Sequence, residues 1–451
     1  MGGTSIPAVK ASPYNIQYLS FQGGGAKGIA YLGALNWLEK YPDNVSTKTP
    51  SPLPLYNGQQ AGNRIVGITG ASAGAIIALF VALGYHSDDI KSRLWSLDLV
   101  DAPEPGLCRS VPPGVIPLPD VPIGSGLSSG LDTVIAKLLQ SNPIHQYLEP
   151  MLSKLTKDLI NNTTYKILSN ANYLNCLVMD GGVLSGQKLL AFLQQAITDS
   201  RLLLGMTKEM PHRPPKFDGT SMTFGDFWQI NKGTVMLAIT ATNLTTGRPM
   251  VFSHYTTPYF PVANAVSISA SYPFLFKSVW VSSQQQLGPA ARKADYVGWY
   301  ADAGITDNCP IHVFDNVSNN GQILADPTGP LSGPTSSTFT PGLNPGMLGL
   351  RLAEGDAPAA SSGQPPPDPQ TTQSAFAVGR AVYGALQFGA NDGQLRDEFE
   401  RNQTVIIQTG GLTLTDFSPQ KETIDKGMQN GYNAMAAYYS MPSQLLTLTK
   451  N

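Results

Sequence analysis

Two segments near the start of the chain share one pattern: an apolar run of strand length, a glycine-containing turn, and then apolar residues at helical spacing. The apolar runs are residues 14–21 and 65–70, and the apolar residues after the second turn extend from 75 to 80. After the first turn, the residues at this spacing are Ile29, Leu32, Leu35 and Leu38. The pattern predicts strand–helix–strand–helix, which is typical of the beginning of a layered α/β fold.

Apolar and β-branched runs further along the chain predict more elements. Residues 234–242 are suited to a central strand. Residues 250–253 are expected to pair with this strand across the turn at 245–248. The remaining predictions are short strands at 297–301 and 404–409, mainly helices over 131–200, and a closing helix at 420–439.

Stretches rich in proline, glycine and serine interrupt these elements. Residues 102–130 are either a surface loop beside the cleft of a functional site or a plain connector. Residues 325–346 and 355–374 are of low complexity and are predicted to be loops. With residues 1–12 as a flexible tail, the predicted organisation is a single domain over 13–445 with these three loop insertions.

Composition and charge exclude several classes of protein. The 451 residues are 42% apolar, which is enough for a sizeable core. Only 13% are charged and the formal net charge is -2, so no basic surface for nucleic acid is expected. Cys108, Cys176 and Cys309 show neither metal-ligand spacing nor a disulfide framework. Without a signal peptide or an apolar run of membrane-spanning length, the chain is expected to be cytoplasmic or peripheral at a membrane.

The turn after the second apolar run has the form Gly-x-Ser-x-Gly, in which Ser72 lies between Gly70 and Gly74. A serine at the top of a strand-to-helix turn has a strained backbone, and small neighbours avoid collisions there. The N-terminus of the following helix favours negative charge that develops near the hydroxyl. The turn therefore predicts a nucleophile, Ser72, in an elbow formed with Gly70 and Gly74.

The first turn, residues 23–28, is compatible with two chemistries. Its Gly-x-Gly-x-x-Gly spacing between a strand and a helix is that of a dinucleotide site, which also needs an acidic residue at the end of the second strand. Because the second strand ends in Gly-Ala-Ser-Ala-Gly instead, an oxyanion hole is favoured. The residues expected to form it are Gly23, Gly24, Gly25 and Ala26, with Lys27 and Gly28 as auxiliary residues.

A nucleophilic serine needs a base, and the residues leave two arrangements open. His312 lies ten residues after Asp302, and the order Ser72, Asp302, His312 is that of a hydrolase triad. Alternatively, Asp302 ends the predicted strand at 297–301 and accepts the serine proton directly, as one half of a dyad. Asp180, in Asp-Gly-Gly, is a rival acid of the same type.

Three motifs together resemble those of the patatin-like phospholipases. The family combines Gly-Gly-Gly-x-[Lys/Arg]-Gly, Gly-x-Ser-x-Gly, and a later Asp-Gly-[Gly/Ala] that leads to Asn-x-Pro. Here the motifs lie at 23–28, 70–74 and 302–304 leading to 308–310, with Ala303 where the family usually has glycine. Similar stretches also lie at 182–186, 241–247, 269–276 and 344–351, so the resemblance covers nearly the whole chain.

The resemblance implies a three-layer α/β/α domain around a central mixed, mostly parallel sheet. It also implies a lipid acyl hydrolase of the phospholipase A type, in which Ser72 forms the acyl-enzyme, Asp302 is the general base and Gly304 is auxiliary. No metal or organic cofactor is needed. The expected partners are a phospholipid or other acyl lipid and, transiently, a membrane surface. The alternatives are an esterase for small soluble esters that uses Ser72, Asp302 and His312, and a nucleotide-binding module without hydrolytic activity.

Overall fold

A computed structural model of the chain describes residues 7–8, 16–40, 53–54, 65–95, 97, 182–204, 218–281, 296–315, 344, 346–353, 402–412, 419–440 and 446–447. The predicted loops at 102–130 and 355–374, and nearly all of the one at 325–346, lie outside these residues. So do most of the predicted helices over 131–200. Cys108, Cys176 and the rival acid Asp180 also lie outside the described residues.

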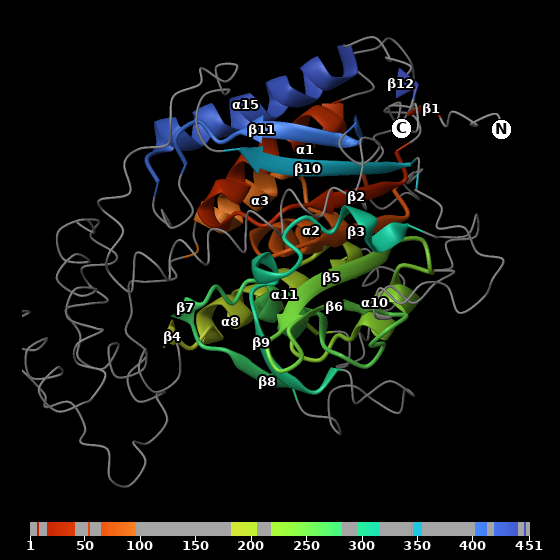
Figure 1. Cartoon of the computed structure of the whole chain (residues 1–451), viewed down its shortest axis with the longest axis vertical. Helices are drawn as coiled ribbons and strands as arrows, with labels where there is room; N and C mark the ends of the chain where they lie inside the picture. Colours follow the sequence, from red (N-terminus) through yellow and green to blue (C-terminus); the bar gives the residue numbers. More distant parts are fainter. Residues whose placement is uncertain are drawn as a thin grey trace, which may run out of the picture.

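The described strands form one large eight-stranded sheet, against which helices pack, and two separate two-stranded sheets (Figure 1). The strands are β1 (Pro7–Ala8), β2 (Tyr18–Phe21), β3 (Gly67–Gly70), β4 (Gly182–Leu184), β5 (Met236–Asn243), β6 (Arg248–Ser253), β7 (Phe274–Phe276), β8 (Val279–Val281), β9 (Gly298–Ala301), β10 (Met347–Ala353), β11 (Thr404–Gln408) and β12 (Leu446–Thr447). The helices are η1 (Gly25–Ala30), α1 (Tyr31–Lys40), α2 (Ala73–Ala82), α3 (Ser87–Trp95), α8 (Gln187–Thr198), α10 (Phe224–Ile230), α11 (Val262–Ser269), η3 (Ala303–Ile305), η4 (Ile311–Phe314) and α15 (Lys421–Ser440), where η denotes a 3-10 helix.

The large sheet is mixed and mostly parallel, which confirms the predicted fold class. Its strand order is β11-β10-β2-β3-β5-β9-β8, and β6 also pairs with β5. The pairs from β11 to β5 are parallel, whereas β6, β8 and β9 join in antiparallel pairs. The predicted pairing of 250–253 with the central strand is present, with Met250 opposite Ala241.

Helices α1, α2, α11 and α15 cover one face of this sheet and form the main core with it. Two glycines allow α15 to pack closely on α1 and on the end of η1. A Cβ at Gly33 would overlap the backbone of Met428, and a Cβ at Gly431 would overlap the carbonyl oxygen of Ala30. On the other face, residues of η4 form a smaller apolar cluster with strand residues, and Trp228 of α10 packs against this cluster. None of the described helices combines the length and apolar content that a membrane-spanning helix needs.

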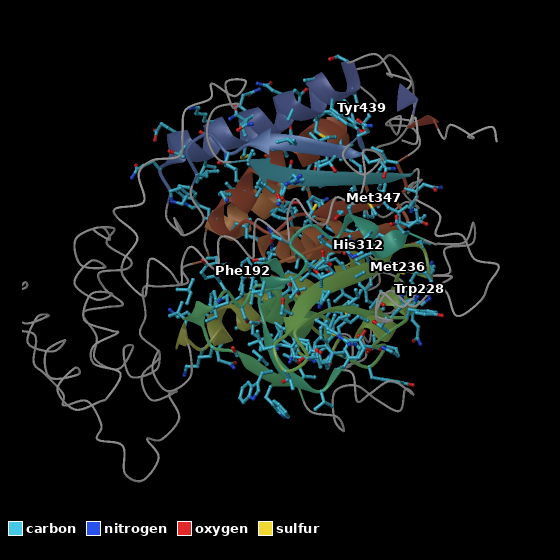
Figure 2. All side chains as sticks on the ribbon, viewed as in Figure 1. Phe192, Trp228, Met236, His312, Met347 and Tyr439 are labelled. Atoms are coloured by element: carbon cyan, nitrogen blue, oxygen red, sulfur yellow. The ribbon has the colours of Figure 1, made fainter. Side chains whose placement is uncertain are left out.

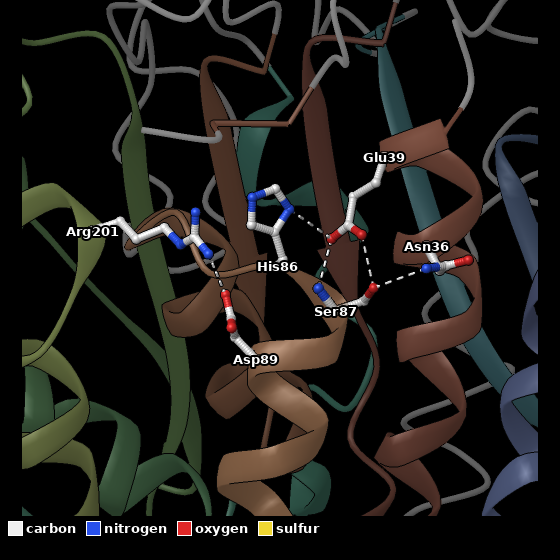
Figure 3. A network of polar contacts seen from close by, with 6 residues as sticks. All are labelled: Asn36, Glu39, His86, Ser87, Asp89 and Arg201. Atoms are coloured by element: carbon white, nitrogen blue, oxygen red, sulfur yellow. Dashed lines mark hydrogen bonds and ion pairs between the residues drawn. The ribbon is translucent and has the colours of Figure 1, made fainter. Parts of the chain in front are cut away.

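A polar network joins α1 to α3 and to the segment after α8 (Figure 3). The Glu39 carboxylate accepts hydrogen bonds from the backbone N–H and the hydroxyl of Ser87, at 2.6 and 2.8 Å. Asn36 donates to the same hydroxyl at 3.3 Å, and Arg201 donates to Asp89 at 2.7 Å. Because Ser87 begins α3, Glu39 satisfies an N–H group that has no acceptor within its own helix. The network therefore holds α1, α3 and the segment after α8 together.

The structure changes several predicted boundaries and adds elements. The strand predicted at 14–21 begins only at Tyr18, and part of the glycine-rich turn folds as η1. The closing helix predicted at 420–439 is α15, displaced by one residue. Strand β10 and helix α11 were not predicted. In β10, Gly349 and Arg351 interrupt the apolar run, yet the strand pairs with two neighbours inside the sheet.

Candidate active site

The predicted nucleophile and base lie at the facing ends of two strands that share one edge of β5. On β5, Ala238 faces β3 on one side and β6 on the other, and Thr242 faces β9 on one side and β6 on the other. Strands β3 and β9 therefore lie one after the other along the same edge of β5. Because β3 is parallel and β9 antiparallel to β5, their C-terminal ends point at each other. Ser72 follows the first end, and Asp302 follows the second.

Ser72 has the strained backbone that its turn predicts. Its φ of 53° and ψ of -126° lie in a region that side-chain-bearing residues rarely adopt, and it immediately precedes α2. A Cβ at Gly70 would overlap the carbonyl oxygen of Gly74, and a Cβ at Gly74 would overlap that of Phe21. Such a conformation costs about 1–3 kcal/mol and needs support from its surroundings. The two glycines thus allow α2 to start directly against β2 and β3.

Ser72 and Asp302 are in direct contact. The Ser72 hydroxyl donates a hydrogen bond of 2.6 Å to Oδ2 of Asp302, whose Oδ1 accepts the backbone N–H of Gly304 at 2.7 Å. Only 1% of Asp302 is exposed, and this burial raises the pKa of its carboxyl group to about 7. The hydrogen bonds from Ser72 and Gly304 lower that pKa, but by less than burial raises it. The carboxylate can accept the hydroxyl proton of Ser72 without an intermediary.

The backbone of Asp302 is held by two further contacts. Its N–H donates to the carbonyl of Ser271 at 3.0 Å, and its own carbonyl accepts the Thr242 hydroxyl at 2.8 Å. Thr242 comes from β5 and Ser271 from just after α11. Sequence reasoning did not single out either residue, although both lie in stretches that resemble the family. No local pattern could reveal them, because each contact joins distant parts of the chain.

The glycine-rich turn lies against Ser72, with one correction to its predicted roles. The N–H of Gly23 donates to the carbonyl of Asn308 at 2.9 Å, so Gly23 does not fit the predicted role of an oxyanion donor. Gly23 is needed for space instead, since its Cβ would overlap Asn308 Oδ1 and lie 2.9 Å from Ser72 Cβ. Gly25 has a φ of 55° and begins η1.

The other predicted residues of this turn also lie in or beside η1. Gly24 and Gly28 are buried, whereas Gly25, Ala26 and Lys27 are only half-buried. The N–H groups at the start of a helix have no acceptor within that helix, which makes those of Gly25 and Ala26 candidates to bind an anionic oxygen. A Cβ at Gly28 would lie 3.2 Å from Ala73 Cβ, so this glycine lets η1 approach the start of α2.

His312 lies away from the contact between Ser72 and Asp302. Its Nε2 is 3.6 Å from Oδ2 of Asp307. Its helix, η4, packs near the starts of the parallel strands, where Met236 and Met347 lie (Figure 2). The hydrogen bonds of Ser72 and Asp302 involve no histidine among the described residues. Across all the residues that the structure describes, no three histidine, cysteine, aspartate or glutamate side chains are grouped as a metal site requires.

Comparison with known proteins places the sequence motifs in a family. A family model described as patatin-like phospholipase matches residues 19–315, which is more than half of the chain. No curated protein sequence matches significantly.

Among solved structures, the chain matches VipD from Legionella pneumophila with a TM-score of 0.42 and 19% identity, over 94% of this chain and 67% of that one. The type III effector ExoU matches with a TM-score of 0.34 and 15% identity, over 97% of this chain and 59% of that one. ExoU of Pseudomonas aeruginosa in its complex with SpcU matches with a TM-score of 0.36 and 16% identity, over 98% of this chain and 58% of that one. The chain therefore spans less than two thirds of ExoU.

Proposed function

Because the chain belongs to the patatin-like phospholipase family, we propose that it is a lipid acyl hydrolase that cleaves ester-linked fatty acyl chains through an acyl-enzyme on Ser72. Asp302 is the general base and then the general acid. The observation that carries this proposal is the hydrogen bond of 2.6 Å between the Ser72 hydroxyl and the buried Asp302 carboxylate. A base is most effective when its pKa lies near the working pH, and burial brings the pKa of Asp302 to about 7.

The reaction has two halves. In the first, Ser72 Oγ bonds to the ester carbonyl carbon while its proton passes to Asp302 Oδ2, and the protonated acid then gives this proton to the departing alcohol. In the second, water attacks the acyl-enzyme, Asp302 takes the proton of the water, and the fatty acid leaves as Ser72 Oγ recovers its proton. The backbone amides of Gly24, Gly25 and Ala26 stabilise the oxyanion in both halves.

The proposed substrate is a phospholipid or another acyl lipid, reached by transient contact with a membrane surface. The mechanism needs no metal or organic cofactor, since a carboxylate and backbone amides supply the base and the oxyanion donors.

Two other functions are weighed against this one. An esterase that uses His312 would need its imidazole between Ser72 and Asp302, where the two side chains already contact each other. A nucleotide-binding module would need an acidic residue after β3, where the chain instead has the Ser72 turn. Comparing the rate of hydrolysis of phospholipid vesicles with that of short p-nitrophenyl esters tests the first alternative. Equilibrium dialysis with NAD tests the second.

The experiment that tests the proposal is labelling with a fluorophosphonate probe, followed by lipid profiling. The probe should react with Ser72 alone, because only an activated serine attacks phosphorus readily. The Ser72→Ala variant should lose both labelling and the release of fatty acids. Ser253→Ala, which alters a buried serine of β6, is the matched control and should retain both. Labelling that persists in Ser72→Ala would overturn the assignment.

A further inference from the structure

We propose that Ser269 is a positioning residue, whose hydroxyl holds the backbone of Ser72 in the conformation required for attack. This inference rests on the proposed function. Ser269 is the last residue of α11 and is fully buried. Its Oγ accepts a hydrogen bond of 2.8 Å from the backbone N–H of Ser72. The proposed reaction uses Ser269 in no chemical step.

The N–H of Ser72 needs an acceptor that its own strand and helix do not supply. It lies beyond the last paired residue of β3 and before the first residue of α2. A buried N–H group without an acceptor is destabilising, and the positive φ of Ser72 adds a second cost. The hydroxyl of Ser269 removes the first cost and so favours the strained conformation over a relaxed one.

The segment that holds Ser72 also holds Asp302. Two residues after Ser269, the carbonyl of Ser271 accepts the backbone N–H of Asp302 at 3.0 Å. The end of α11 thus contacts the nucleophile through a side chain and the base through the main chain. Ser269 and Ser271 therefore tie the backbones of Ser72 and Asp302 to the same short segment.

This arrangement also removes one candidate oxyanion donor. Since the N–H of Ser72 is directed to Ser269, it is not available to a developing oxyanion. Within the glycine-rich turn, the N–H of Gly23 is engaged by the carbonyl of Asn308. The amides of Gly24, Gly25 and Ala26 are therefore the candidates in this turn.

Loss of the Ser269 hydroxyl should affect the chemical step. A displacement of about 1 Å in a reacting group can reduce the rate about a hundredfold. We therefore expect Ser269→Ala to lower kcat ten- to a hundredfold with little change in KM. The apparent pKa of the kcat/KM profile should also rise, because the hydrogen bond from Ser72 that lowers the pKa of Asp302 is weakened. Purely structural damage would reduce the amount of active enzyme without moving that pKa.

The test compares the wild type with Ser269→Ala, Ser269→Thr and Ser267→Ala, using a short p-nitrophenyl ester from pH 5 to 9 and a thermal melt. Ser269→Thr keeps an Oγ and should restore much of kcat. Ser267→Ala removes a hydroxyl from the same helix and should match the wild type. If Ser269→Ala does not fold, Ser269→Cys retains the volume with a much weaker acceptor and should show the loss of kcat.

Two results are kept distinct. If the wild type hydrolyses no ester and Ser72 is not labelled, the proposed function fails. If the wild type is active and Ser269→Ala (or Ser269→Cys) has the same kcat and the same pH profile, the positioning role of Ser269 is wrong.

Discussion

Burial of Asp302 should give the proposed reaction a pH dependence that an exposed aspartate would not produce. Its pKa is about 7, far above the ordinary 3.8, chiefly because burial disfavours the carboxylate. As a base it must be ionised, so kcat/KM should rise with pH and level off above an apparent pKa near 7. The ionised fraction is roughly a tenth at pH 6 and nine tenths at pH 8, so kcat/KM should increase about tenfold between them.

The assay is hydrolysis of a p-nitrophenyl ester between pH 5 and 9, with His312→Ala as the control. An ordinary imidazole titrates near 6.5, so the same rise must persist in this variant if Asp302 is its source. The apparent pKa of a carboxyl group also changes little with temperature, whereas that of an imidazole changes markedly. A flat profile from pH 5 to 9, or a rise that disappears in His312→Ala, would refute the reasoning.

The same burial should make Asp302 a source of instability at neutral pH. Its pKa is about 7 in the folded state and 3.8 in the unfolded state. As the pH rises from 4 to 7, the unfolded state therefore loses its proton first and is favoured, by up to about 4 kcal/mol. Asp302→Asn lacks this term, so its free energy of unfolding relative to the wild type should increase with pH, although turnover is nearly abolished. Urea unfolding at pH 4.5 and 8.5 checks this, and an equal difference at both would show that the carboxylate is not held with a raised pKa.

Three further predictions concern the surroundings of the site. Gly23→Ala should nearly abolish activity, because the added Cβ would displace Asn308 or Ser72. The control is Gly247→Ala, whose Cβ would lie in open space and which should alter stability only. Equal activities of the two variants in an ester assay would contradict this. His312→Ala should keep most of its kcat on phospholipid and on short esters, and a loss of several orders of magnitude with an unchanged melting temperature would favour the triad. Lys27→Ala should reduce hydrolysis of anionic vesicles more at low than at high salt, since salt screens the attraction between a half-buried lysine charge and the vesicle; a variant as active as the wild type at both salt concentrations would leave Lys27 as a solvated residue at the start of a helix.

The parts of the site that the sequence predicts are those whose cause is local. The turn around Ser72 follows from small residues between an apolar run and a helix, since only such residues fit where Gly70 and Gly74 meet neighbouring backbone. Likewise, the strand before Asp302 is recognisable from its composition. The choice of Asp302 over Asp180, however, depends on the family resemblance, because no local pattern distinguishes two acids that each precede a small residue.

Contacts between distant segments were beyond the reach of sequence patterns. The bond from Gly23 to Asn308 spans 285 positions, so nothing near Gly23 could show that its N–H is occupied. Ser269 resembles any serine in an apolar helix until α11 is placed against the Ser72 turn. The order of β3 and β9 along β5 was also unpredictable, because each strand pairs with residues far from it in the sequence.

The facing ends of β3 and β9 bring the two residues of the proposed dyad together without a histidine. In a triad, the imidazole bridges a serine and a carboxylate that belong to separate loops. In this chain, β5 aligns the two strand ends, so that the residues after them meet at hydrogen-bonding distance. From Asp302 the chain then passes along the sheet toward the starts of the strands, where Phe314 packs on Tyr18, and this path carries His312 away from Ser72. The sheet thus performs the alignment, and the burial that it imposes on Asp302 raises the pKa of the carboxyl group toward that of an imidazole.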